Sequence, residues 1–155
     1  MLKSIEIIRK PREFALNLIK DLSPEQLNHV PRGFNNNIIW NLAHMISAQQ
    51  GICYTRAGVP IIIEDRFYTP YRPETRPTGS VDDGDIKIIK DLFLSTIDQL
   101  ETDLGNNLFI NYPSWSTRYG VSMNSIEDAV AFLPFHEGLH CGYIMALKRV
   151  IEQEL

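Results

Sequence analysis

The chain has 155 residues, of which 44% are hydrophobic and 22% are charged, a composition typical of a single globular domain over residues 1–155 and too apolar for disorder. Its net charge of −4 and the absence of a basic cluster exclude a nucleic-acid partner. It has no apolar run of membrane-spanning length, so we expect no membrane partner. Lys3 and Glu6 place charge where a signal peptide needs an apolar stretch, and only two cysteines are present. We therefore expect a cytoplasmic location.

The first predicted helix covers about Lys10–Leu22, where apolar residues recur at helical spacing. Pro11 suits its first turn, because the first turn of a helix does not use the amide hydrogen that proline lacks. Residues 5–8 are also apolar enough to form an earlier turn of the same helix, bent at Pro11. Ser23 and the residues after it end this helix, and residues 23–36 are rich in turn formers, so we predict a connection there.

The second predicted helix covers about Asn37–Ala57 and ends at Gly58. Residues 58–81 carry several prolines and read as a long irregular connection, in which Ile61–Ile63 could form a short strand. A link of this length exceeds what an antiparallel helix pair requires. It could carry the chain along the whole bundle and make the second and third helices parallel.

The third predicted helix covers about Asp82–Leu104, with one regular apolar face. After a connection over residues 105–122, the last helix runs from about Ser125 to Glu152. Pro134 lies inside that helix and should kink it. The pattern predicts an all-α fold, most simply a four-helix bundle.

One face of the last helix places two histidines where a core pattern expects apolar side chains. His136 and His140 are four residues apart, so their imidazoles lie about one turn apart and can reach the same metal ion. The alternative is a pair of core histidines that are hydrogen-bonded independently. The face consists of Ala129, Leu133, His136, His140, Tyr143, Leu147 and Val150.

His44 lies within the second helix on a face shared with Trp40 and small residues. Alone it reads as a core histidine with a hydrogen-bond partner, but a bundle can bring it beside His136 and His140. Three neutral imidazoles with open coordination positions are typical of catalytic metal sites. His29 lies in a polar connection and is predicted to be a solvated surface residue.

Glu137 follows the first histidine of the pair. Residues 136–140 match the H-E-x-x-H pattern of zinc proteases, but the metzincin extension is missing and no strand is predicted that could hold a peptide. Glu137 could orient a bound water or a ligand imidazole and assist proton transfer, which makes it the candidate catalytic residue. The alternatives are a solvated acid and an ion pair.

The remaining candidates are thiols and aromatic rings. Cys53 and Cys141 are expected to be buried, inert thiols, because Cys141 is rotated away from the histidine face. A group of aromatic residues could line a pocket over the metal or could serve in packing. They are Trp40, Tyr68, Tyr71, Trp115, Tyr119 and Tyr143.

These residues together resemble the DinB superfamily. The resemblance rests on the segment Asn37–His44, the spacing from it to His136-x-x-x-His140, the segment Gly142–Ile144, and the early segment Leu22–Leu27. It covers the whole chain. It implies an up-down-down-up four-helix bundle with a long crossover between the second and third helices. It also implies a divalent-metal site on His44, His136 and His140.

The resemblance further implies a function class. Relatives include S-transferases and isomerases that depend on a small thiol such as bacillithiol, mycothiol or glutathione, and many relatives form homodimers. We therefore expect a metal-dependent enzyme, with Zn²⁺ or Ni²⁺, a small-molecule substrate and a small thiol as possible cofactor. A metal-dependent hydrolase and a non-catalytic, stress-related metal-binding module are the alternatives. Gln49 stands where relatives often carry Glu, which leaves any role of such a carboxylate open.

Overall fold

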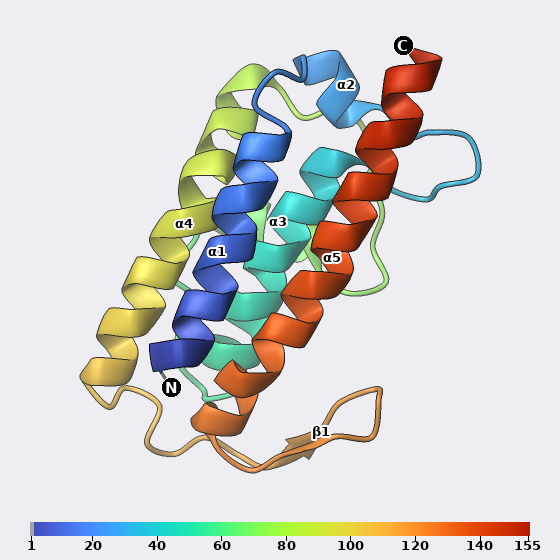
Figure 1. The fold of residues 1–155 in the computed structure, drawn as a ribbon. Helices are drawn as coiled ribbons and strands as arrows, with labels where there is room; N and C mark the ends of the chain where they lie inside the picture. The colour runs from blue at the N-terminus through green and yellow to red at the C-terminus, as the bar shows by residue number, and fades with distance from the viewer. Residues whose placement is uncertain (1) are drawn as a thin grey trace.

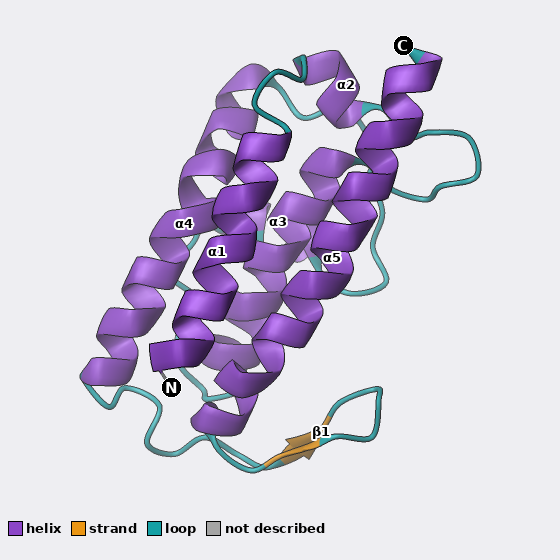
Figure 2. Cartoon of the chain, viewed as in Figure 1, coloured by secondary structure: helices purple, strands orange, loops and turns teal. Residues whose placement is uncertain are grey.

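A computed structural model describes residues 2–155; Met1, the first residue of the predicted domain, lies outside it. Helices dominate the described chain (Figure 2), which confirms the all-α prediction. The long helices lie side by side (Figure 1). They are α1 (Leu2–Leu18), α3 (Ile38–Gln49), α4 (Asp83–Gly105) and α5 (Ile126–Glu154).

Three of these helices begin at side chains that cap their free backbone amides. Asn37 accepts a hydrogen bond from the backbone of Trp40 at the start of α3. Asp82 and Ser125 cap α4 and α5 in the same way, through the backbone amides three residues later. Such caps typically stabilise a helix by about 1 kcal/mol. The predicted starts of these helices are confirmed to within about one residue.

The first helix begins earlier and ends earlier than predicted. Residues 5–8 belong to α1, and Pro11 lies inside it, because this extension buries Ile5 and Ile8 in the core. Burial of two such side chains is worth roughly 3–6 kcal/mol, comparable with the cost of an interior proline. After Leu18 the chain turns into the short helix α2 (Pro24–Asn28), inside a segment predicted as a connection.

Other local elements also differ from the sequence prediction. The π-helix η1 (Gln50–Thr55) continues α3, and the 3₁₀ helices η2 (Asp65–Phe67) and η3 (Thr69–Tyr71) lie in the long connection. Ile61–Ile63 is a loop, so the optional strand there is wrong. A hairpin of β1 (Trp115–Ser116) and β2 (Ser122–Met123) was not predicted. Pro134 lies inside α5, and the kink expected there stays a prediction.

Helix α3 is the buried centre of the structure, with all 12 of its residues buried. It contacts α4 and α5 along its length, while α1 packs against α4 and α5. Polar side chains on α3 therefore lie away from water and need partners inside the protein. Across residues 2–155, no helix is both long and apolar enough to cross a membrane.

Candidate metal centre

The structure brings the three predicted ligands together. One nitrogen from each of His44, His136 and His140 lies within 4.8 Å of the other two. The ring centroids are 4.6–5.3 Å apart. Ligand nitrogens around an ion with bonds of about 2 Å lie roughly 3–4 Å apart. The cluster therefore needs only a small contraction to close on one ion.

His44 is held in the form that can bind a metal. Its Nδ1 lies 2.7 Å from the backbone carbonyl of Tyr71, and its ring stacks on Trp40 at 4.7 Å between centroids. A carbonyl oxygen only accepts hydrogen bonds, so Nδ1 must carry the hydrogen. The lone pair of Nε2 is then available to an ion.

His140 is oriented in the same way by a side-chain amide. Its Nδ1 donates to Oδ1 of Asn41 at 2.8 Å. The Asn41 amide group in turn donates to Asn36 Oδ1 at 3.0 Å and to the Asn37 carbonyl at 2.8 Å. These two bonds determine which end of Asn41 faces the histidine. Nε2 of His140 is therefore the nitrogen whose lone pair is available to an ion.

His136 differs from both, because its buried Nδ1 has no hydrogen-bond partner within the described part of the chain. An unpaired buried nitrogen costs free energy and calls for an explanation. A divalent ion suits such a site, since a neutral imidazole is a common ligand and the ion compensates for lost hydration. The residues present therefore fit a metal ion.

The electrostatics of the cluster favour neutral rings. Burial is the main cause that lowers the pKa of His136 to about 2 and that of His140 to about 3. Burial also lowers the pKa of His44, against the opposing effect of its hydrogen bond to Tyr71. Neutral imidazole is the form that ligates metals. All three ligands are thus ready to bind near neutral pH.

Glu137 points away from solvent into an ion pair. The side chain is fully buried, and its two oxygens accept from Nε and Nη2 of Arg12 at 2.9 and 2.8 Å. Of the alternatives for Glu137, the solvated acid is wrong and the ion pair is present. The catalytic role of Glu137 stays a prediction, and it now requires that the carboxylate act from within this pair.

Arg12 is the polar centre that the sequence analysis missed. Its Nη1 donates to the Phe93 carbonyl at 2.9 Å and to Thr96 Oγ1 at 3.3 Å. Its Nη2 donates to the Met45 carbonyl at 3.2 Å. Gln49 donates to the Thr96 carbonyl at 2.8 Å. Arg12 thus links α1 to α3, α4 and α5 by hydrogen bonds. No sequence pattern around Arg12 predicts these contacts.

Four of the six aromatic residues named from the sequence form two pairs with different contacts. Trp40 and Tyr71 contact His44, and both border a cavity of about 270 Å³. Tyr143 packs edge-on against Phe34, and the guanidinium of Arg56 lies over the ring of Trp115. The first pair belongs to the metal centre, whereas the contacts of the second pair are packing contacts.

The other histidine and the thiols lie outside the cluster. His29 is partly exposed and bonds Glu154 at 2.8 Å. Burial raises the pKa of Cys53 to about 12 and that of Cys141 to about 11. Both thiols are therefore protonated and unreactive near neutral pH, as the sequence analysis expected. Cys53 is fully buried and Cys141 only partly.

Comparison with known proteins agrees with this geometry. The family model described as the DinB superfamily matches residues 8–144, a span that includes all three histidines. No curated protein matches the chain. The matched span covers most of the sequence, so the chain belongs to the DinB superfamily.

Proposed function

We propose that this DinB-superfamily chain is a divalent-metal-dependent enzyme that uses a small thiol to act on a small molecule, as an S-transferase or isomerase. The observation that carries the proposal is the convergence of three neutral imidazoles, one with an unpartnered nitrogen within residues 2–155. Three protein ligands leave coordination positions for a reactant, as in catalytic sites. Zn²⁺ and Ni²⁺ are the favoured ions, because both accept imidazole ligands.

The residues around the cluster have distinct tasks in this proposal. A bound divalent ion lowers the pKa of a coordinated thiol or water and so supplies a nucleophile near neutral pH. The Tyr71 carbonyl and the Asn41 side chain hold two imidazoles with Nε2 toward the ion. Trp40 holds the His44 ring from its face. A cavity of about 270 Å³ lies beside Trp40 and Tyr71, and none of the three histidines lines it.

The test combines metal content with a screen for thiol transfer. Protein stripped of metal and reloaded with Zn²⁺ or Ni²⁺ should bind about one ion per chain and transfer a small thiol to an electrophilic substrate. Ester or amide cleavage without added thiol would instead favour the hydrolase. One bound ion without turnover in either assay would favour the non-catalytic metal-binding module.

We also propose the up-down-down-up order of the long helices. In Figure 1, α1 and α5 begin at the end of the bundle that holds the N-terminus, while α3 and α4 begin at the other end. The Tyr54 hydroxyl, near the end of η1, donates to Asp103 near the end of α4 at 2.6 Å, which supports a parallel α3 and α4. Spin labels at the exposed Thr55 and Thr102 should lie close together, whereas an antiparallel pair would separate them by roughly 30 Å.

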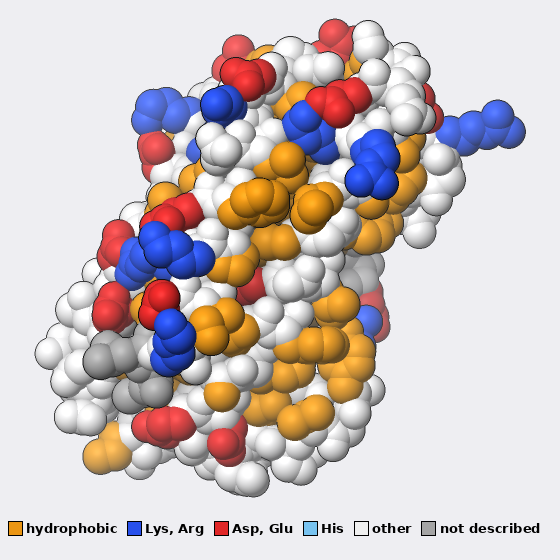
Figure 3. Space-filling model, in the orientation of Figure 1, with side chains coloured by type: hydrophobic (Ala, Val, Ile, Leu, Met, Phe, Trp, Pro, Cys, Tyr) orange, Lys and Arg blue, Asp and Glu red, His pale blue; other side chains and the backbone are white. Residues whose placement is uncertain are grey.

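A homodimer is the assembly we propose. Figure 3 shows hydrophobic side chains gathered on the face formed by α1 and α5, and Phe14, Leu139 and Met145 are 50%, 47% and 44% exposed. Exposed apolar patches of this kind often mark interfaces. Leu139→Glu should convert a dimer to a monomer in light scattering, whereas Ile62→Glu, in the long connection, should not. A wild-type monomer at micromolar concentration would contradict the proposal.

A further inference from the structure

One turn of the long connection lies against the face of α3 that carries His44. It consists of Tyr68 and the short helix η3 (Thr69–Tyr71), and we call it the 68–71 turn. None of the three residues of η3 is buried, although Tyr68 and Tyr71 pack partly against the core. Because the turn buries little apolar surface of its own, it depends on polar contacts for a fixed position.

Two hydrogen bonds attach the two ends of this turn to α3. At its end, the Tyr71 carbonyl accepts from His44 Nδ1 at 2.7 Å. At its start, the Tyr68 carbonyl accepts from the Ser47 hydroxyl at 2.9 Å, and the same oxygen accepts from the Tyr71 amide at 3.2 Å. His44 and Ser47 lie on one face of α3, because they are three residues apart in a helix. A single bond would let the turn pivot, whereas the two bonds together fix where the Tyr71 carbonyl points.

The side chain of Tyr68 is held further along the same face. Its hydroxyl is hydrogen-bonded to the Thr55 hydroxyl at 3.1 Å. A Cβ atom at Gly51 would lie 3.3 Å from the Tyr68 hydroxyl oxygen, so the missing side chain at Gly51 leaves room for the tyrosine. Ser47 is only 1% exposed, and its bond to the Tyr68 carbonyl is therefore shielded from competing water.

We propose that Ser47 is a positioning residue of the metal centre. Its hydroxyl fixes the 68–71 turn, and the Tyr71 carbonyl of that turn holds His44 in the tautomer whose Nε2 lone pair is available to an ion. Hydrogen bonds of this kind set the tautomer and the orientation of a ligand imidazole and strengthen metal binding. The inference rests on the proposed metal-binding role of His44 and adds a residue that acts through two backbone carbonyls.

The first measurement uses metal-free protein with isotope-labelled histidine, and NMR of the ring nitrogens shows which nitrogen carries the hydrogen. In the wild type, His44 and His140 should both carry it on Nδ1. Ser47→Ala should shift His44 toward the form protonated on Nε2, because the acceptor of its Nδ1 is no longer fixed. His140 should stay unchanged, since Asn41 holds that ring independently. The variant His44→Gln identifies the signals of His44.

The second measurement is the affinity for Co²⁺, read from the cobalt absorption spectrum. Ser47→Ala should bind Co²⁺ about tenfold more weakly, the lower end of the range for losing a hydrogen bond to a ligand imidazole. Ser125→Ala is the matched control, because it also removes a serine hydroxyl that accepts or donates a hydrogen bond, here the cap of α5. It lies on the order of 16 Å along α5 from His136, so it should lose stability and keep the wild-type affinity.

The inference predicts both changes together in Ser47→Ala. An unchanged His44 tautomer in that variant would overturn it, as would wild-type affinity for Co²⁺ or an equal loss of affinity in Ser125→Ala. Each of these outcomes leaves the proposed function intact, because the wild type still binds the ion. Failure of the wild type to take up Co²⁺ would overturn the proposed function, and with it the ligand role of His44 that Ser47 is proposed to support.

Discussion

His136 and Glu137 are neighbours in α5, yet their side chains enter two very different polar clusters. Glu137 joins Arg12 in a network in which the guanidinium finds acceptors on α3, α4 and α5. His136 joins two other imidazoles, and within the described chain its Nδ1 has no partner. Buried polar groups are usually paired, so an unpaired one calls for an explanation, such as an ion that the site could hold. Two adjacent residues thus enter one cluster whose contacts support the fold and another that could hold a metal ion.

Of the two clusters, the histidine cluster should show the larger effect when its side chains are removed, namely the loss of bound metal. We expect His136→Ala/His140→Ala to reduce bound metal from about one ion per chain to none, because only three protein ligands hold it. His44→Ala should weaken binding severely for the same reason. Elemental analysis after dialysis measures this loss. His29→Ala, at the partly exposed His29–Glu154 pair, should retain the ion, and metal kept by the double variant would place the site elsewhere.

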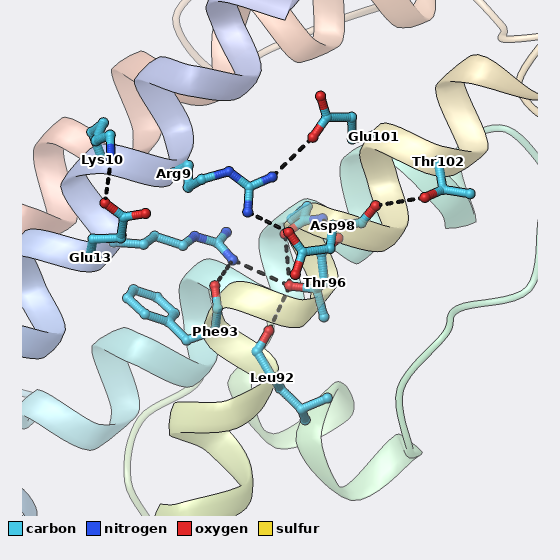
Figure 4. Close-up of polar contacts among 11 residues, drawn as sticks. Arg9, Lys10, Glu13, Leu92, Phe93, Thr96, Asp98, Glu101 and Thr102 are labelled. Carbon is cyan, nitrogen blue, oxygen red and sulfur yellow. Dashed lines mark hydrogen bonds and ion pairs between the residues drawn. The ribbon is translucent and has the colours of Figure 1, made fainter.

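Breaking the Arg12–Glu137 pair should affect folding first. Arg12→Ala leaves a carboxylate buried without its partner, so we expect a loss of about 3–5 kcal/mol in the free energy of unfolding, measured in urea. Replacing both residues, as Arg12→Met/Glu137→Leu, removes both charges and should recover most of that loss. Arg9→Ala breaks exposed pairs with Asp98 and Glu101 (Figure 4) and should cost less than about 1 kcal/mol.

The same pair decides what Glu137 can do in catalysis. Glu137→Gln keeps the shape and should keep the metal, although it should also lose stability because Arg12 remains charged. If Glu137 handles a proton, activity per folded, metal-loaded protein should fall by about 10²–10⁴. A loss below tenfold would limit Glu137 to its ion pair and leave the two clusters independent.

Asn41 tests whether the histidine cluster depends on its hydrogen-bonded support. Asn41→Leu removes the acceptor of His140 Nδ1 and should weaken metal binding by about 10–100-fold. Asn41→Asp retains an acceptor for His140 Nδ1 but loses the amide that donates to Asn36 and Asn37, so its metal affinity should fall less than that of Asn41→Leu while its stability also falls. Calorimetric titration of metal into both proteins provides the comparison. Equal metal affinities for the two variants would mean that the hydrogen bond from His140 to residue 41 is not needed to orient the imidazoles.

Much of the candidate site could be predicted because its signals are local. His136 and His140 interrupt an apolar face at helical spacing, and α3, α4 and α5 each begin at a capping residue. The short helix α2 also has a local signal, the capping box of Ser23 and Gln26, although from the sequence alone these residues indicate only the end of the preceding helix. Arg12 had none, because its partner Glu137 lies 125 residues away. The backbone carbonyl of Tyr71 could not be predicted either, since any residue supplies one.

Cys53 offers the smallest test of how buried polar groups behave near the Arg12 network. Burial raises the pKa of its thiol from 9.0 to about 12, and the nearby Arg12 charge opposes this only in part. The folded state thus keeps the proton that the unfolded chain loses above pH 9. Stability is therefore complete below pH 9 and falls as the pH rises toward 12.

Between pH 8 and pH 10, the wild type should lose about 1.4 kcal/mol more than Cys53→Ala, a value that follows from the linkage of one proton. Cys141 and Tyr54 titrate in both proteins and cancel in the difference. Urea unfolding at the two pH values, with the same metal content in both proteins, measures it. Parallel losses in the two proteins would show that the thiolate is tolerated beside Arg12. The network would then stabilise a second negative charge besides Glu137. The paired polar groups around Arg12 and the histidine cluster, where Nδ1 of His136 has no partner in the described chain, would then differ less in their capacity for a further charge than their contacts indicate.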